Sequence, residues 1–279
     1  MIVTAPAKIN LTLEVIKKRP DGFHEIRSVV QTLSYGDKIK ITASPRLEIK
    51  CNLPAWSLNK SLVNKTVSLL RNSAAGNQGA LIEIEKRIPL SSGLGGDSSD
   101  AAAILRGLGL LWNLKLSQRD LLAYGAQLGS DVSLFLYGGT LLLEGRGEII
   151  RPLKPMPHMS VILLVPPLQR PENKTQLMYS QLTVRHYSSG QHTRDFINML
   201  EGRAAAPGLK LYNVFDSVGL QFFTALSEYK KKFEEAGAVE VHLAGSGPTL
   251  YTALRDDVRA YDIHQKLLKM KLEAYLTEF

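Results

Sequence analysis

Residues 86–103 read Lys86-Arg-Ile-Pro-Leu-Ser-Ser-Gly-Leu-Gly-Gly-Asp-Ser-Ser-Asp-Ala-Ala-Ala103, and the rest of the chain is organised around them. Apolar and polar residues alternate at 81–84, which predicts a strand that Pro89 is expected to end. Gly93, Gly95 and Gly96 then give backbone positions that no side chain obstructs. Residues 98–100 (Ser-Ser-Asp) are expected to cap a small-residue helix over 101–112. The free N–H groups and the dipole of a helix start make such a loop a ready site for phosphate oxygens.

The glycines do not fit two well-known nucleotide loops. A Walker A loop requires a Gly-Lys pair followed by Ser or Thr, and no such pair follows these glycines. A dinucleotide fingerprint requires a third glycine three residues after Gly95, where Ser98 stands instead. A flexible turn capped by serines is the alternative. Because a proline, three glycines, two serines and an alanine run lie in register before a helix, the anion-binding loop is favoured.

The composition provides ample material for a core and an excess of positive charge. Of the 279 residues 44% are hydrophobic, and 34 Lys and Arg against 26 Asp and Glu give a formal net charge of +8. This charge favours an anionic partner. Nucleic acid is one candidate, but the basic residues are scattered without interleaved aromatics, and a phosphorylated small molecule fits equally well.

Cysteine content and hydropathy indicate the compartment. Cys51 is the only cysteine, so the sequence predicts no internal disulfide and favours a reducing compartment. Residues 1–6 lack the basic and apolar regions of a signal peptide. The longest apolar strings, such as 161–165, are too short to cross a bilayer. We therefore expect a soluble cytoplasmic protein that binds neither nucleic acid nor membrane.

Hydrophobic periodicity predicts strands and helices without strict alternation, which indicates an α+β fold in both halves. Strand 2–16 is expected to be half-buried, with Lys8 and Asn10 on its polar face. The other predicted strands are 26–33, 37–42, 140–143, 159–165, 239–243, 249–254 and 272–277. The predicted helices are 61–75, 117–128, 213–235 and 256–270, with two more starting at Thr175 and Thr193. Three prolines fall within 151–157, and we place a domain boundary there.

Two charged residues could carry chemistry. Asp131 heads the apolar segment 132–137, where an ionised carboxylate is costly to bury without a partner. From spacing alone, a helix cap and a general base explain this aspartate equally well. A lysine on a lone strand, such as Lys8, is expected to be a solvated surface residue unless further residues give it a role.

Four motifs resemble those of the GHMP kinases in the same order and spacing. They are 6–11 (Pro-Ala-Lys-Ile-Asn-Leu), the glycine loop over 89–102, 129–132 (Gly-Ser-Asp-Val) and 243–249 (Leu-Ala-Gly-Ser-Gly-Pro-Thr). The resemblance covers nearly the whole chain. It implies the two-domain α+β fold of these kinases, with the site in the cleft between the halves. The ribosomal-protein-S5-like N-terminal domain would span 1–153 and the ferredoxin-like C-terminal domain 154–279.

The resemblance also implies the chemistry. The residues that would bind ATP, with Mg²⁺ neutralising its phosphates, are Pro89, Leu90, Ser91, Ser92, Gly93, Leu94, Gly95, Gly96, Asp97, Ser98 and Ser99. Asp131 would take the proton of an alcohol as the bond to phosphorus forms. Lys8 would keep that carboxylate ionised and stabilise the developing alkoxide. No residue is assigned as a dedicated metal ligand.

Within this family, the segments 21–24 (Asp-Gly-Phe-His) and 145–148 (Gly-Arg-Gly-Glu) resemble those of a member that phosphorylates a cytidine diphosphate derivative in the non-mevalonate isoprenoid pathway. The resemblance implies that Phe23 stacks on cytosine and that His24 binds its polar edge; ordinary core packing is the alternative. The other implied substrate-binding residues are Asn10, Thr175, Tyr179, Gly245, Ser246 and Gly247. A simple strand-to-strand turn is the alternative for 245–247.

Four residues depart from the family pattern. Phe23 replaces a commoner Tyr, Asp97 a third loop glycine, Ser61 an Asn and Ser133 a Pro. The charge of Asp97 is unfavourable beside ATP unless the carboxylate points away. These departures bear on nucleotide affinity more than on reaction type.

The sequence therefore predicts an ATP-dependent kinase, monomeric or weakly homodimeric, that phosphorylates a small molecule carrying a cytidine diphosphate. A GHMP kinase of the homoserine or mevalonate type is the nearest alternative, but it gives residues 21–24 no evident purpose. A non-catalytic ligand sensor on the same fold would need neither Lys8 nor Asp131. Nucleic-acid binding would show as affinity that collapses with salt.

Overall fold

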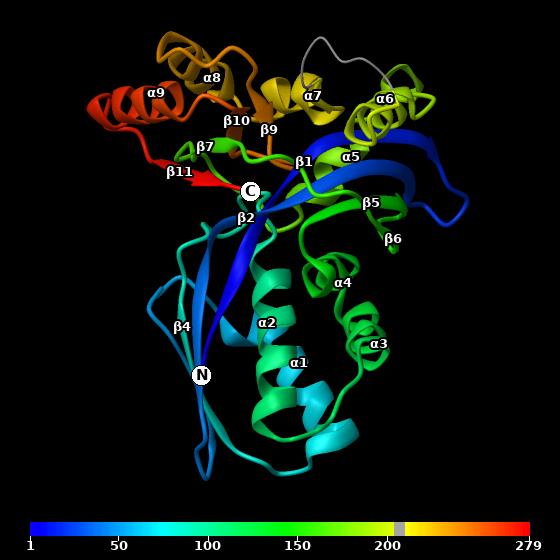
Figure 1. The fold of residues 1–279 in the computed structure, drawn as a ribbon, viewed down its shortest axis with the longest axis vertical. Helices are drawn as coiled ribbons and strands as arrows, with labels where there is room; N and C mark the ends of the chain where they lie inside the picture. The colour runs from blue at the N-terminus through cyan, green and yellow to red at the C-terminus, as the bar shows by residue number, and fades with distance from the viewer. Residues whose placement is uncertain (204–209) are drawn as a thin grey trace. The chain divides into compact units, whose positions relative to one another are not determined.

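A computed structural model describes residues 1–203 and 210–279 (Figure 1). Contacts divide the chain into two compact units, each built from several segments. Unit 1 comprises Met1–Ala7, Tyr35–Leu90 and Gly95–Gly138, and unit 2 comprises Lys8–Ser34, Ser91–Leu94 and Gly139–Phe279. The domain boundary between residues 153 and 154 stays a prediction.

Two long strands contribute residues to both units. Strand β1 spans Ile2–Lys18, as predicted, and β2 spans His24–Thr42, where the sequence predicted two strands with a break at 34–36. The break is absent because Gly36 does not form a turn. Instead it allows the backbone of β2 to pass close to that of β1. A Cβ on Gly36 would lie 2.8 Å from the Cα of Pro6, so only glycine lets the two backbones pass.

The polar face of β1 is buried, which corrects the prediction of a half-buried strand. Lys8, Asn10 and Glu14 are each at most 7% exposed. Glu14 is stabilised there because its carboxylate accepts hydrogen bonds from the Thr193 N–H at 2.7 Å and the Ser188 hydroxyl at 2.7 Å. Period-2 alternation therefore identified the strand correctly, but polar character did not mean contact with solvent.

Unit 1 places helices on a small sheet. Its further strands are β3 (Leu47–Cys51) and β4 (Ala80–Glu85). Its helices are α1 (Leu62–Leu70), α2 (Gly96–Leu111), α3 (Gln118–Leu128) and α4 (Ser130–Tyr137), with a 3-10 turn at Leu58–Lys60 and a π-helical turn at Arg71–Ala75. β4 pairs antiparallel with β2 over Lys38–Thr42 and parallel with β3. In Figure 1, α1 and α2 run side by side along this sheet, and α2 and α3 both contact α4.

Capping explains where two of these helices begin. The Ser61 hydroxyl accepts from the N–H of Val63 and caps α1. Ser117 and Asp120 form a reciprocal capping box at the start of α3. Both starts agree with the sequence prediction.

Unit 2 contains most of the remaining elements. Its strands are β5 (Thr140–Gly145), β6 (Ile149–Pro152), β7 (Ser160–Leu164), β8 (Tyr212–Asn213), β9 (His242–Leu243), β10 (Leu250–Leu254) and β11 (Ala274–Glu278). Its helices are α5 (Lys174–Ser180), α6 (Gln191–Leu200), α7 (Phe215–Phe222), α8 (Leu226–Glu235) and α9 (Asp257–Lys269), with a 3-10 turn at Val184–His186. β5 contains the strand predicted over 140–143, and β6 pairs with it antiparallel.

A four-stranded sheet gives unit 2 its ferredoxin-like part. The strand order is β11-β7-β10-β9, and each neighbouring pair is antiparallel. Helices α7, α8 and α9 lie together on one side of this sheet (Figure 1). The core between them includes Phe215, Leu226, Phe233, Ile263 and Leu267. This arrangement confirms the α+β fold class.

Two predicted elements of unit 2 differ from the structure. The helix predicted over 213–235 is divided into α7 and α8, because Phe223 is extended and buries its ring in the core. The strand predicted over 239–243 is reduced to β9, and Val239 before it is 76% exposed. No helix among residues 1–203 and 210–279 is long and apolar enough to span a membrane.

Candidate active site

The first half of the glycine loop, residues 91–94, is held by other parts of unit 2. The N–H of Lys8 donates to the carbonyl of Leu94 at 3.0 Å. The N–H of Thr249 donates to the carbonyl of Ser92 at 3.3 Å. The loop backbone is therefore fixed between β1 and the turn that precedes β10.

Gly93 shows why this loop needs a glycine. Its φ is +91°, and a Cβ there would lie 3.1 Å from both the carbonyl carbon of Ala244 and the carbonyl oxygen of Gly247. Any side chain would push the loop away from the 244–249 turn. The glycine is required by close backbone packing as well as by φ.

The second half of the loop becomes the start of α2 in unit 1. Gly95 is the N-cap residue, with φ +80°. The first helical hydrogen bond of α2 runs from the Ser99 N–H to the Gly95 carbonyl at 3.0 Å. Residues 98–100, predicted as caps, therefore lie inside the helix, because the left-handed glycine turns the chain into the helix earlier. The first N–H groups of a helix have no intrahelical acceptor, so they can donate to phosphate oxygens.

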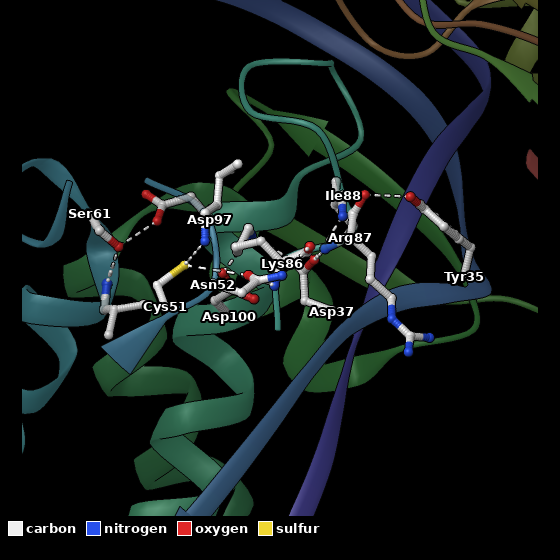
Figure 2. A network of polar contacts seen from close by, with 12 residues as sticks. Tyr35, Asp37, Cys51, Asn52, Ser61, Lys86, Arg87, Ile88, Asp97 and Asp100 are labelled. Carbon is white, nitrogen blue, oxygen red and sulfur yellow. Dashed lines mark hydrogen bonds and ion pairs between the residues drawn. The ribbon is translucent and has the colours of Figure 1, made fainter. Parts of the chain in front are cut away.

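Asp97, which stands where the family has a glycine, points toward the start of α1. Its carboxylate accepts from the Ser61 hydroxyl at 2.7 Å (Figure 2) and from the Leu62 N–H at 3.0 Å. Its charge lies at the positive end of the α1 dipole. Two departures from the family pattern, Ser61 and Asp97, are thus partners of each other.

The hydroxyl of Ser99 is suited to bind part of a nucleotide. The residue is 1% exposed, and its Oγ has no hydrogen-bond partner among the described residues. A buried hydroxyl without a partner is costly unless something binds it. A phosphate oxygen or a hard cation such as Mg²⁺ would satisfy this oxygen, so the loop fits both. Within the described part of the chain, no group of three or more His, Cys, Asp or Glu could hold a metal by itself.

A buried ion cluster anchors the start of α2 (Figure 2). The Lys86 ammonium donates to the carboxylate of Asp37 and, at 2.7 Å, to that of Asp100 on α2. Burial disfavours the charge of Lys86, but Asp100 and Asp37 outweigh it and raise the lysine pKa. Burial raises the pKa of Asp100 well above its ordinary value, although Lys86 opposes the shift. A Cβ on Gly96 would lie 3.3 Å from the Lys86 Nζ, so the cluster contacts the loop directly.

The same cluster ends β4 earlier than predicted. Asp37 accepts from the N–H groups of Arg87 at 2.5 Å and Ile88 at 2.7 Å. Because a side chain takes these backbone donors, β4 ends at Glu85 and not at Pro89. Pro89 lies in the segment that leads into the loop.

In unit 2, Lys8 and Asn10 lie next to each other on β1. The Lys8 ammonium donates to the Asn10 Oδ1 at 2.9 Å, and the Asn10 amide donates to the Ser28 hydroxyl at 2.9 Å. The Asn10 carbonyl accepts from the Tyr251 hydroxyl at 2.6 Å. The Asn10 side chain, itself held by Ser28, therefore fixes the position of the Lys8 ammonium. It is not the solvated lysine expected of a lone strand.

The turn over 245–247 lies beside Lys8. A Cβ on Gly245 would be 3.0 Å from the Lys8 Nζ. The Asn213 amide donates to the Gly245 carbonyl at 2.8 Å, and the hydroxyls of Thr175 and Ser246 are 3.1 Å apart. Unit 2 therefore brings together Lys8, Asn10, half of the glycine loop and the 245–247 turn, as the motifs implied.

The aromatic residues predicted to hold cytosine are only partly together. The rings of His24 and Tyr179 stack with centroids 5.1 Å apart. Phe23 is 56% exposed, and the Arg146 guanidinium lies 4.8 Å from its ring centroid. Burial, together with the charge of Lys18, lowers the pKa of His24 and favours the neutral ring.

Asp131 lies in the first turn of α4, in unit 1. The N-cap residue of α4 is Gly129, so the cap alternative for Asp131 is wrong. It is the acidic residue of that first turn. Lys8 belongs to unit 2, and the pairing of Lys8 with Asp131 stays a prediction.

Sequence reasoning missed three charged residues of these regions: Lys86, Asp37 and Lys174. Lys174 is 4% exposed and donates to the Gly247 carbonyl. It stands in the polar string Glu-Asn-Lys-Thr-Gln at 172–176, which is typical of a solvated segment. For Lys86, the one available signal was its place between a strand and the glycine loop.

Comparison with known proteins identifies the family. Residues 61–139 match the GHMP kinases N terminal domain. A 4-diphosphocytidyl-2-C-methyl-D-erythritol kinase of Dehalococcoides mccartyi is 40% identical, over 99% of this chain and 97% of the relative. One of Geobacillus thermodenitrificans is 36% identical, over 95% of this chain and 92% of the relative.

Solved structures agree. A 4-(cytidine 5'-diphospho)-2C-methyl-D-erythritol kinase superposes with a TM-score of 0.84 at 27% identity, covering 100% of this chain and 98% of the other. Homoserine kinase from Cytophaga hutchinsonii has a TM-score of 0.72 at 19% identity, covering 100% of this chain and 93% of the other, and so shares the fold. The chain is an ATP-dependent small-molecule kinase, and it belongs to the 4-diphosphocytidyl-2-C-methyl-D-erythritol kinase family of the GHMP kinases.

Proposed function

We propose that this kinase transfers the terminal phosphate of ATP to the 2-hydroxyl of 4-diphosphocytidyl-2-C-methyl-D-erythritol, in the non-mevalonate pathway to isoprenoid precursors. The relatives that carry this name match the chain along nearly its whole length. One geometric observation carries the proposal. Lys8, Asn10, loop residues 91–94 and the 245–247 turn meet within unit 2, which gives an ammonium and phosphate-binding backbone at one place.

The chemistry requires removal of a proton from an alcohol. Asp131 is proposed as the general base that takes this proton. Lys8, held by Asn10, stabilises the charge that develops on the attacking oxygen. The helix start at 95–98 and loop residues 90–94 are proposed to donate N–H groups to the phosphates of ATP.

The nucleotide is proposed to bind together with Mg²⁺. The unpartnered hydroxyl of Ser99 would hold the ion or a phosphate oxygen of the nucleotide. When bound, Mg²⁺ neutralises phosphate charge. The neighbouring Asp97 does not compete for this place, because Ser61 and Leu62 hold its carboxylate.

The cytidine end of the substrate is proposed to bind at the aromatic residues of unit 2. The exposed ring of Phe23 can stack on a base, and His24, kept neutral by burial, can exchange hydrogen bonds with the polar edge of cytosine. Tyr179, stacked on His24, supports that ring. Thr175, whose hydroxyl lies 3.1 Å from that of Ser246, is proposed to bind the phosphorylated part of the substrate together with the 245–247 turn.

The remaining expectations complete the proposal. The domains are proposed to be 1–153 and 154–279. The protein is proposed to act in the cytoplasm as a monomer or weak homodimer, without nucleic acid or membrane as partner.

The test is ADP release with 4-diphosphocytidyl-2-C-methyl-D-erythritol, homoserine and mevalonate compared side by side. We expect turnover with the cytidyl substrate alone. Asp131→Asn is expected to lower kcat by about 100- to 10,000-fold, the usual effect of removing a positioned base. Asp120→Asn is the matched control, because Asp120 also lies in the first turn of a helix of unit 1 but serves a capping box. Near-normal kcat in folded Asp131→Asn would remove Asp131 from this role, and binding without ADP release would indicate a sensor.

A further inference from the structure

Lys174, at the start of α5, is buried, and residues 1–203 and 210–279 provide no counter-ion for it. It is 4% exposed, and its ammonium donates to the carbonyl of Gly247. No carboxylate of the described residues forms an ion pair with it. A neutral carbonyl offsets only part of the cost of removing an ammonium from water.

The charged groups around Lys174 are positive. Lys8 on β1 and Arg170 in the segment before α5 both act on it, and Glu273 acts on Arg170. Burial, followed by the charges of Lys8 and Arg170, lowers the pKa of Lys174 to about 7. Two buried ammonium groups therefore share a region that has excess positive charge.

The ammonium groups of Lys8 and Lys174 also lie beside the same turn, residues 245–247. Lys174 binds the carbonyl of Gly247, and the Lys8 Nζ would lie 3.0 Å from a Cβ on Gly245. Thr175, next to Lys174, places its hydroxyl 3.1 Å from that of Ser246. Hydrogen-bond donors thus gather at the 245–247 turn: the side chains of Lys8, Lys174 and Thr175 lie beside it, and Ser246 is part of it. Such a group of donors is typical of a phosphate site.

We propose that Lys174 is a second substrate-binding cation, which together with Lys8 binds a phosphate oxygen at the 245–247 turn. This inference rests on the proposed function, since a phosphorylated substrate supplies the anion. The phosphate belongs either to the diphosphate of the cytidyl substrate or to the terminal phosphate of ATP. Both sources provide the same chemistry, and binding measurements separate them.

Such an anion changes the protonation of Lys174. In the free protein the amine is about half neutral at pH 7 and mostly neutral at pH 8. A phosphate beside it favours the ammonium and raises its pKa, so binding takes up a proton above pH 7. Affinity for the ligand must then fall as pH rises from 7 to 9, because the proton becomes harder to supply.

The experiment is isothermal titration calorimetry at pH 8 in two buffers of different ionisation enthalpy. One series uses 4-diphosphocytidyl-2-C-methyl-D-erythritol alone, and another uses a non-hydrolysable ATP analogue alone. We expect uptake of up to about one proton with the ligand whose phosphate reaches Lys174. Lys174→Met should abolish the uptake and weaken binding by about 10- to 100-fold, the effect of one charge-assisted hydrogen bond.

Two further variants separate binding from folding. Lys174→Arg keeps a permanent charge, so it should retain more affinity than Lys174→Met while losing the proton uptake and the pH dependence between 7 and 9. Lys266→Met, an exposed lysine of α9, is the control and should behave as the wild type. A purely structural Lys174 would change the free energy of unfolding and leave the wild-type affinity flat over this pH range.

The outcomes distinguish this inference from the proposed function. Absence of proton uptake with both ligands in the wild type, or unchanged binding in folded Lys174→Met, would overturn the role of Lys174. If the ATP analogue binds with proton uptake while the cytidyl substrate does not bind, Lys174 keeps its role and the proposed substrate is wrong.

Discussion

Lys86 in unit 1 and Lys174 in unit 2 are both buried but have opposite electrostatic environments. Lys86 is 9% exposed and Lys174 is 4% exposed. Lys86 is held by Asp37 and Asp100, and its pKa is raised. Lys174 has a carbonyl and two positive neighbours, and its pKa is lowered to about 7.

The comparison teaches that burial alone does not define what a lysine does. Where the fold supplies the counter-ions, the ammonium joins elements together, as Lys86 joins β2, β4 and α2. Where the fold supplies no counter-ion, as at Lys174, burial disfavours the ammonium until an anion binds beside it. The first arrangement serves to position the glycine loop, and the second serves to bind a ligand.

The largest expected effect comes from breaking the cluster of unit 1. Lys86→Met leaves Asp37 and Asp100 as buried carboxylates without a cation, and it should lower the free energy of unfolding by about 3–5 kcal/mol. Urea denaturation measures this loss. Lys40→Met is the matched control, because Lys40 pairs with Glu83 at 3.0 Å on the surface and should cost less than about 1 kcal/mol. Equal losses in the two variants would contradict the buried-pair account.

Lys174 should give a smaller effect that depends on pH. Its pKa is about 7 in the folded state and roughly 10.4 in the unfolded state. The unfolded chain thus binds more protons between these values, so the wild type gains stability as pH rises through them. Lys174→Met lacks this gain. Relative to the wild type, the variant should therefore lose about 2–3 kcal/mol between pH 6 and pH 9.

Thermal or urea unfolding at both pH values measures the difference for Lys174→Met. Lys266→Met should show no such change with pH, because Lys266 is exposed. A difference that stays flat from pH 6 to pH 9 would mean that Lys174 is not destabilised by burial, and the contrast with Lys86 would disappear.

The smallest effect concerns Asp97, whose carboxylate forms no ion pair among the described residues. Asp97 is stabilised by the Ser61 hydroxyl and by the start of α1. Ser61→Ala and Asp97→Ala should each lower the free energy of unfolding by about 1 kcal/mol, the usual value of a helix cap or dipole contact. The double variant should cost less than the sum by about 0.5 kcal/mol or more, because the residues are partners. Strict additivity would show that they act independently.

Local chemistry predicted the elements near the glycine loop well. The capping serines Ser61 and Ser117 and the alternation of β1 are properties of neighbouring residues, so the sequence determines them. Where a distant residue intervened, the prediction failed. β4 ends at Glu85 because Asp37, some fifty residues away, takes the backbone donors beyond it.

The candidate site divides in the same way. The glycine loop was predicted from its residues, because phosphate binding needs particular residue types at fixed spacing. Lys8, Asn10 and the 245–247 turn were implied by the resemblance to the GHMP kinases. Lys174 was not predicted, since it stands in a polar string and is buried only through its contact with Gly247. The pairing of Asp97 with Ser61 likewise needed the position of α1 beside α2.

By itself, the sequence determined the α+β class and the glycine loop before a helix, because spacing along the chain encodes periodicity and caps. Its motifs indicated the kind of reaction through their resemblance to the GHMP kinases. The tertiary structure alone decided which charges are buried and which of them have partners. Burial and counter-ions depend on residues far apart in the sequence, and the same lysine side chain is an anchor at 86 and a binding group at 174 for that reason.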